Sequence, residues 1–157
     1  MIFRKAKIEE QDFILQLYNH DRFKPYTAWD DTYPTMDNIK EDISNNNLFV
    51  LEDENEILGS IAINTINELD NEEEYRNEIG LEFARVIVNF KYRGKGYSKI
   101  LIKNVEEEIK RRGYHHIHIC VYENDDIALS LYQKLGYIKL SRKKLFDYYF
   151  ILFKKEL

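Results

Sequence analysis

The sequence has few of the features that mark exported or membrane-spanning proteins. Its single cysteine, Cys120, cannot form an internal disulfide, so we expect a reducing, cytoplasmic location. No run approaches the roughly 18 apolar residues of a membrane-spanning helix, so we expect no membrane partner. The first residues, MIFRKAKIEE, have no long apolar stretch behind their positive charges, and we do not expect a signal peptide.

Positive charge is also scarce. The 23 lysines and arginines are outnumbered by 28 aspartates and glutamates, which gives a formal net charge of −5. We therefore expect no nucleic-acid partner, and any anionic ligand must be held by a local basic site. The remaining composition, with 44% hydrophobic and 32% charged residues in 157, is typical of one globular domain spanning residues 1–157.

Hydrophobic periodicity predicts strands and helices along the whole chain. The predicted strands are Met1–Ala6, Asn47–Glu52, Glu56–Ile66, Leu81–Val88, His115–Val121, Tyr137–Leu140 and Asp147–Phe153. The predicted helices are Glu9–His20, a short helix that includes Met36, Ile39 and Ile43 with Thr35 as its N-cap, Gly96–Arg111, and Asp125–Leu135 capped by Asp125 or Asp126. The order β-α-α-β-β-β-α-β-α-β-β predicts an α/β (α+β) fold, a mixed sheet with helices on both faces.

Four further segments complete the pattern. Both prolines of the chain lie in the predicted loop Pro25–Pro34, and "EDEN" (Glu52–Asn55) is expected to be a hairpin turn. The segment Glu68–Glu78, with six acidic residues against one arginine, is interpreted as a solvated loop. Tyr148–Phe153 is apolar on both faces, so we expect this strand to lie inside the sheet.

Two of the six glycines, Gly94 and Gly96, lie between a predicted buried strand and an amphipathic helix, in the run Arg93-Gly94-Lys95-Gly96. The first N–H groups of a helix lack internal partners and carry a partial positive charge. Glycines permit a close approach to these groups, and Arg93 and Lys95 add positive charge, so the arrangement suits a phosphate or pyrophosphate. The alternative is an ordinary exposed basic turn. The run matches neither a Walker A loop nor a dinucleotide-binding G-x-G-x-x-G.

The same stretch resembles the acyl-CoA signature of the GNAT superfamily of N-acyltransferases, Gln/Arg-x-x-Gly-x-Gly/Ala. It contains Arg93, Gly94, Gly96 and Tyr97 with Ser98 in the last position, and Val88 stands five residues before Arg93. The family's downstream motif is Asn-x-x-Ala-x-x-Leu-Tyr-x-x-x-Gly-Phe/Tyr. The matching positions here are Ala128, Leu131, Tyr132, Gly136 and Tyr137, with Asp125 in the asparagine position and Asn124 one residue earlier.

This resemblance implies a fold, a co-substrate and a set of cofactor-binding residues. The fold would be a mostly antiparallel sheet of six to seven strands with four helices on its two faces. Acetyl-CoA would lie between the strands Leu81–Val88 and His115–Val121, with its pantetheine paired to the backbone of Val86, Ile87 and Val88. The pyrophosphate would be bound by the N–H groups of Arg93, Gly94, Lys95, Gly96, Tyr97 and Ser98, and the asparagine contact would come from Asn124 or Asp125.

The resemblance also implies two catalytic residues. Glu82 stands eleven residues before Arg93, the spacing at which the histone-acetylating branch of the family places its glutamate. By strand alternation it would share a face with Ala84, Val86 and Val88, so a partly desolvated carboxylate could accept the proton of an amine. The alternative is a glutamate that faces water at the strand end. Tyr132 would donate a proton to the CoA sulfur, and the alternative is a tyrosine that only packs in the core.

The acceptor site is expected in the loop between the first two helices, where Tyr26, Trp29, Asp30 and Tyr33 could hold a cationic amine. The alternative is a hydrophobic cluster that pins the loop. His116, His118 and Cys120 alternate on one strand face, but we predict no metal site, because no fourth ligand is offered nearby.

These observations favour an N-acetyltransferase that moves the acetyl group of acetyl-CoA to a primary amine of a small molecule or peptide by direct attack. One alternative is a non-catalytic CoA-binding regulatory or sensor module, and another is a protein that binds a nucleotide phosphate in the same loop. The apolar terminal strands are compatible with a homodimer.

Overall fold

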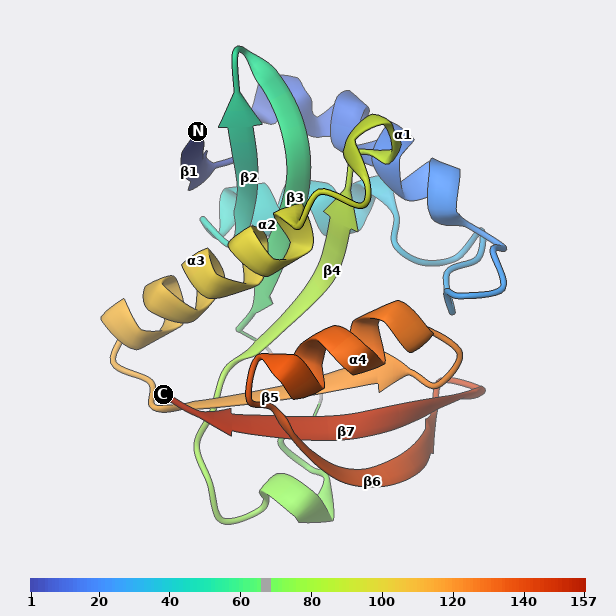
Figure 1. The fold of residues 1–157 in the computed structure, drawn as a ribbon, viewed down its shortest axis with the longest axis vertical. Helices are drawn as coiled ribbons and strands as arrows, with labels where there is room; N and C mark the ends of the chain where they lie inside the picture. The colour runs from blue at the N-terminus through green and yellow to red at the C-terminus, as the bar shows by residue number, and fades with distance from the viewer. Residues whose placement is uncertain (66–68) are drawn as a thin grey trace.

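The chain folds into two antiparallel sheets with four α-helices packed on them, as a computed structural model that describes residues 1–65 and 69–157 shows (Figure 1). The four-stranded sheet has the order β1-β2-β3-β4, formed by Ile2–Lys5, Leu48–Asp53, Glu56–Asn64 and Glu82–Val88. The three-stranded sheet has the order β5-β7-β6, formed by His116–Tyr122, Tyr148–Glu156 and Ile138–Leu145. The helices are α1 (Gln11–Asp21), α2 (Met36–Ser44), α3 (Tyr97–Arg111) and α4 (Asp126–Lys134).

The predicted element order is confirmed, and several local signals act as expected. Thr35 begins α2, where its backbone N–H donates to Asn38 Oδ1 at 2.7 Å. The turn between β2 and β3 holds Glu54 and Asn55 at φ values of 49° and 65°, the left-handed conformation of a tight hairpin. The strand β7 lies between β5 and β6, as its two apolar faces indicated.

The segment between β3 and β4 differs from the prediction. Ile66, the predicted end of the strand, and Glu68, the predicted start of a loop, lie outside the described residues. In the described part of this segment Leu69 and Tyr75 are buried, so it is not simply solvated. The Tyr75 hydroxyl donates to the backbone oxygens of Ile119 and Phe153 at 3.2 and 2.7 Å, which ties the segment to the second sheet.

The two sheets meet at one parallel bridge between Leu81 and Ile117. Leu81 N donates to His116 O and His118 N donates to Leu81 O, both at 3.1 Å. After this bridge β4 continues along β3 while β5 continues along β7, and the two strands diverge (Figure 1). The expected mixed sheet is therefore parted between its fourth and fifth strands.

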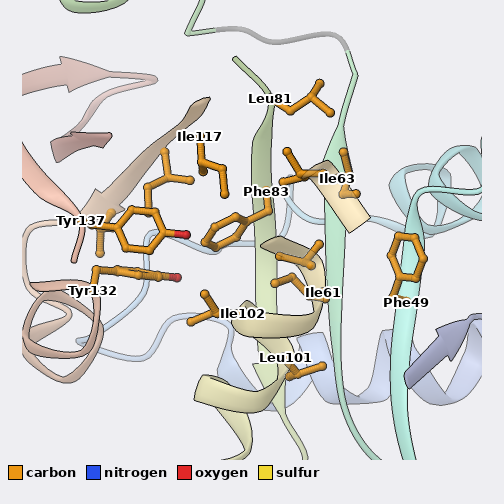
Figure 2. Close-up of a cluster of buried hydrophobic side chains, with 14 of the residues drawn as sticks. Phe49, Ile61, Ile63, Leu81, Phe83, Leu101, Ile102, Ile117, Tyr132 and Tyr137 are labelled. Atoms are coloured by element: carbon orange, nitrogen blue, oxygen red, sulfur yellow. The ribbon is translucent and has the colours of Figure 1, made fainter. Parts of the chain in front are cut away.

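Two main apolar clusters lie on opposite faces of the first sheet. On one face α3 packs its buried residues, such as Leu101 and Ile102, against β3 and β4, and this cluster continues to Tyr132 and Tyr137 (Figure 2). On the other face α1 and α2 bury Ile14, Leu17, Tyr18 and Ile39 against the sheet. None of the helices in the described part of the chain is long and apolar enough to cross a membrane.

Candidate active site

The strand β4 leads directly into the glycine loop. It ends at Val88 and is followed by a 3₁₀ turn, Phe90–Tyr92, and by Gly94 and Gly96 at φ values of 78° and 82°. A side chain at either glycine would meet no atom within 4 Å, so the left-handed backbone rather than lack of space requires glycine here. The loop then enters α3 at Tyr97.

The amino end of α3 offers free hydrogen-bond donors. Within the described residues, no side chain caps the helix at Gly96. The backbone N–H groups of Gly94, Lys95 and Gly96 also donate to no backbone carbonyl of these residues. The first N–H groups of the helix add to this set, together with the positive end of the helix dipole. The backbone of the loop therefore fits the diphosphate of a coenzyme A molecule.

The Arg93 side chain has a different role from the predicted one. Its guanidinium donates to both carboxylate oxygens of Asp21 at 2.9 Å, to Val88 O at 3.1 Å and to the Tyr26 hydroxyl at 3.2 Å. Its charge is thus balanced by Asp21 instead of being left for a phosphate. This corrects the expectation that Arg93 adds positive charge to the loop and leaves Lys95 as the cation there.

The edge of β4 that faces β5 exposes alternate backbone groups. Asn89 N donates to Leu58 O at 2.8 Å, which places Asn89, and by alternation Ile87, in hydrogen-bonded pairs with β3. The backbone groups of Val86 and Val88 then point to the open edge, where the Val88 oxygen already accepts from Arg93. Of the three residues predicted to pair with pantetheine, Val86 and Val88 are therefore suitably oriented, whereas Ile87 points to β3.

A β-bulge in β4 changes which side chains share a face. Ala62 pairs with Ala84 and Ser60 with Ile87, so one residue of β3 faces two of β4, and Arg85 has a φ of 52°. After the bulge Val88 packs in the α3 cluster. Glu82, by contrast, contacts Asn64, which is bound to Arg85 on the α2 face. The prediction that Glu82 shares a face with Val86 and Val88 is wrong, because the bulge shifts the alternation by one residue.

Glu82 is only 5% exposed and accepts a hydrogen bond from Asn64 Nδ2. This burial contradicts the alternative in which the carboxylate faces water. It lies close enough to Tyr33 to raise the pKa of that phenol, although burial is the main cause of the rise. A desolvated carboxylate beside the predicted acceptor loop is suited to remove a proton from an amine.

Tyr132 lies on α4 at the other side of the gap between β4 and β5. Its ring packs against Phe83, Tyr137 and Phe153, with ring centroids 5.4 to 6.3 Å apart (Figure 2). The Tyr137 hydroxyl donates to Glu106 at 2.7 Å, but within the described residues no group accepts from the Tyr132 hydroxyl. Burial raises the pKa of Tyr132, so its hydroxyl remains protonated at neutral pH and can act as a donor.

Asp125 is the N-cap of α4. Its Oδ1 accepts from Ala128 N at 3.0 Å, and burial raises the pKa of this carboxyl. Asn124 lies outside the helix and donates through Nδ2 to the Tyr122 hydroxyl at 3.1 Å. The asparagine position of the resemblance is therefore occupied by a capping aspartate, and the predicted cofactor contact of Asn124 stays a prediction.

The four residues predicted to bind the acceptor fall into two pairs. Trp29 packs edge-on against Tyr18 at 5.3 Å, and the Tyr26 hydroxyl donates to Asp21 at 3.1 Å, so these two anchor the loop. Tyr33 instead accepts from Arg85 Nη1 at 2.8 Å and lies beside Glu82. Asp30 accepts from the Tyr148 hydroxyl of β7 at 3.2 Å and is partly exposed.

Several residues of this region were missed by sequence reasoning. A polar network next to Glu82 is formed by Arg85, Asp42 and Asn64. From β7, the Tyr148 hydroxyl donates to Asp30 of the acceptor loop. An arginine inside the apolar strand EFARVIV signals a buried ion pair, because a lone buried charge is too costly. The sequence does not indicate which carboxylate pairs with it, since Asp42 is 43 residues away.

His116 and His118 both lie close to Glu78. His118 is buried, its Nε2 lies 2.7 Å from Glu78 Oε1, and its ring stacks on Tyr75 at 4.1 Å. His116 Nδ1 lies 3.5 Å from the same oxygen. Among the described residues no group of three or more His, Cys, Asp or Glu side chains could hold a metal ion.

Two hollows lie away from these residues. One, of about 570 Å³, is between β1, β2 and α3, and the other, of about 460 Å³, is between α1 and the 3₁₀ turn Phe90–Tyr92. Neither is lined by a predicted site residue. The chemistry is therefore expected where β4 and β5 diverge.

Comparison with known proteins agrees with this geometry. Residues 12–137 match the model of the acetyltransferase (GNAT) family. A Yersinia pestis acetyltransferase is 28% identical over 137 residues, which cover 87% of this chain and 84% of that protein. A Yersinia enterocolitica acetyltransferase is 26% identical over the same length, with the same coverage of both chains.

Solved structures share the fold. The ribosomal-protein-alanine N-acetyltransferase of Brucella melitensis superposes with a TM-score of 0.80 at 20% identity and full coverage of both chains. The yncA protein of Salmonella typhimurium, solved with its cofactor acetyl-CoA, has a TM-score of 0.79 at 18% identity and covers 99% of this chain and 93% of its own. The chain belongs to the acetyltransferase (GNAT) family and is an acyl-CoA-dependent N-acetyltransferase with acetyl-CoA as co-substrate.

Proposed function

We propose that this protein transfers the acetyl group of acetyl-CoA to a primary amine of a small molecule or peptide by direct attack. One observation carries the proposal. The open edge of β4 runs from the buried Glu82 to the uncapped amino end of α3, so one continuous backbone offers pantetheine pairing and diphosphate binding beside a carboxylate. No covalent intermediate on the protein is needed, because the amine and the thioester meet in one site.

Two side chains supply the proton transfers. Glu82 takes a proton from the acceptor ammonium, and the neutral amine nitrogen then forms a bond to the thioester carbon. As the carbon–sulfur bond breaks, the Tyr132 hydroxyl donates a proton to the leaving sulfur. The attacking nitrogen loses its second proton as the amide forms, and this proton restores the phenol of Tyr132, directly or through water. The raised pKa of Tyr132, caused first by burial, supports this role because the phenol stays neutral until the thiolate forms.

The charge and the aromatic rings of the acceptor loop suit a cationic amine. Asp30 carries a partly exposed carboxylate in the acceptor loop. Thr32 donates to it through its backbone and its hydroxyl, which lowers the pKa of Asp30 and keeps it ionised. The rings of Tyr33 and Tyr148, whose hydroxyls contact Arg85 and Asp30, are suitable neighbours for an ammonium group. Asp30 and Tyr33 are thus the proposed acceptor-binding residues.

The test is the change Glu82→Gln, measured as the pH dependence of kcat/KM for a panel of amines with acetyl-CoA. If Glu82 is the base, kcat/KM falls by ~10²-fold or more and the acidic limb of the profile disappears. An unchanged profile would exclude Glu82 as the base. A non-catalytic CoA-binding module would instead bind CoA in calorimetry but release no thiol with any amine of the panel.

A further inference from the structure

Arg85 is a buried charged residue in the middle of β4, and it makes four hydrogen bonds. Its guanidinium donates to both carboxylate oxygens of Asp42 at 3.1 Å, to the Tyr33 hydroxyl at 2.8 Å and to Asn64 Oδ1 at 2.6 Å. The bulge at Arg85, with its φ of 52°, directs the side chain to the α2 face. A single guanidinium therefore joins α2, the acceptor loop and the end of β3.

The contact with Arg85 fixes the orientation of the Asn64 amide. An amide has one acceptor oxygen and one donor nitrogen, whereas a guanidinium has donors only. Since Oδ1 must face Arg85, the NH₂ group of Asn64 points away from it, where it donates to Glu82 Oε1. Turning the amide over would set donors against donors at Arg85 and an oxygen against the carboxylate of Glu82.

We propose that Arg85 and Asn64 are positioning residues for Glu82, and that Arg85, by also holding Tyr33, sets the distance between the base and the acceptor loop. This inference rests on the proposed role of Glu82 as the base. Asn64 donates a hydrogen bond to Glu82 Oε1, which stabilises the ionised carboxylate and restricts its orientation beside the acceptor loop. Arg85 acts on the reaction through Asn64 and Tyr33.

The charges around Glu82 define what a change at Asn64 would do. Several charged and titratable groups lie around Glu82 and its partner Asn64. Arg85 on β4 binds Asn64 and Asp42 of α2, and the charge of Glu82 acts on Tyr33 in the acceptor loop and on Tyr75 before β4, on both of which Cys120 of β5 also acts. Only Arg85 among them is positively charged. A carboxylate at position 64 would keep its contact with Arg85 but would repel Glu82 and favour its protonated form.

The experiment compares Asn64→Asp with wild type in the pH profile of kcat/KM, with acetyl-CoA and the best amine of the panel. We expect the acidic limb to move to higher pH by about one unit or more. The matched control is Asn47→Asp. Like Asn64, Asn47 accepts from an arginine and donates to a side chain: its Oδ1 accepts from Arg112 at 2.8 Å and its Nδ2 donates to Thr65 at 3.4 Å. It does not contact Glu82. The acidic limb of the Asn47→Asp profile should coincide with that of wild type.

A second variant, Asn64→Ala, removes the donor without adding charge and should move the limb in the same direction by less. Circular dichroism and thermal unfolding establish that each variant folds. If Glu82→Gln abolishes the acidic limb while both Asn64 variants leave it unmoved, the positioning role is wrong but the assignment of Glu82 as the base stands. If Glu82→Gln itself leaves the limb in place, the proposed base is wrong and this inference fails with it.

Discussion

At the scale of single residues, the account depends on two buried groups on either side of the gap between β4 and β5. Glu82 belongs to the α2 face of β4, and Tyr132 belongs to the α4 face of β5. Their surroundings differ in kind. Glu82 accepts from the Asn64 amide, whereas the Tyr132 hydroxyl lies among rings. A base must accept a proton and an acid must donate one. The Asn64 amide donates to the Glu82 carboxylate, while burial raises the pKa of Tyr132 and keeps its hydroxyl protonated.

Removal of the Tyr132 hydroxyl tests the proposed acid. Tyr132→Phe keeps the ring that packs against Phe83 and Tyr137, so the melting temperature should change little while kcat falls by ~10-fold or more. The control is Tyr114→Phe, which changes a partly buried tyrosine packed against the same cluster from the loop between α3 and β5. Full turnover in the Tyr132 variant would assign its hydroxyl a packing role only.

The sequence predicted which residues lie near the site better than it predicted where their side chains point. Glu82 and Tyr132 are placed as candidates by motif spacing, and both are buried beside the gap. The side chain of Arg93 turns back to Asp21, 72 residues earlier, and no local pattern encodes that long-range contact. The same holds for the loop aromatics, because only the packed structure separates the anchor Trp29 from Tyr33 at the site.

At the scale of elements, the segment that precedes β4 is held to the second sheet by a histidine. The His118 ring is buried against Tyr75, and its Nδ1 has no hydrogen-bond partner among the described residues. A side chain at Gly80 would approach this ring to within 2.7 Å, so the backbone before β4 must pass close to it. The docking of this segment therefore depends on a neutral imidazole, which places the start of β4 under the influence of pH.

This dependence predicts an acid-sensitive stability. Burial lowers the pKa of His118, with the hydrogen bond to Glu78 opposing it, so the unfolded chain binds a proton near pH 6.5 that the folded chain excludes. The stabilisation is present above that pH and decreases as the pH falls below it. Urea unfolding at about pH 7.5 and about pH 5.5 should show a loss of free energy of unfolding in wild type that is smaller in His118→Gln.

The control for this prediction is His116→Gln. His116 lies on the same strand face and within 3.5 Å of Glu78, but its side chain is 29% exposed. It should keep the wild-type difference between the two pH values. Equal losses in wild type and His118→Gln would show that another group causes the acid sensitivity.

The type and order of the α-helices and strands in residues 1–65 and 69–157 follow from sequence periodicity, whereas the bulge in β4 does not. Its cause is the fit between β3 and β4 around Arg85 and the pairing of that arginine with Asp42, both of which depend on tertiary contacts. Because a bulge shifts side-chain alternation by one residue, it reverses the predicted relation between Glu82 and Val88. This error in the predicted site thus arises from one extra residue in β4.

At the scale of the whole molecule, the site is produced by the separation of two sheets. One bridge at Leu81 and Ile117 joins them, and the strands part just where Glu82 begins β4. The outer edge of the second sheet is β6, which carries Lys139, Arg142, Lys143 and Lys144. Charges on an exposed edge oppose pairing with a second sheet, so the predicted homodimer would have to use another surface.

The central claim is that the glycine loop before α3 binds the diphosphate of coenzyme A, and calorimetric titration with CoA tests it most directly. Gly96→Val forces a branched side chain into a left-handed conformation at the amino end of α3, and Gly113→Val does the same just past its carboxyl end, at φ values of 82° and 92°. Both changes carry a similar backbone strain, but only the first alters the proposed cradle.

We predict that wild type and Gly113→Val bind CoA more tightly than ATP, and that Gly96→Val weakens CoA binding by ~10-fold or more while still unfolding cooperatively. Equal CoA affinity in a folded Gly96→Val variant, or tighter binding of ATP than of CoA by wild type, would contradict the account.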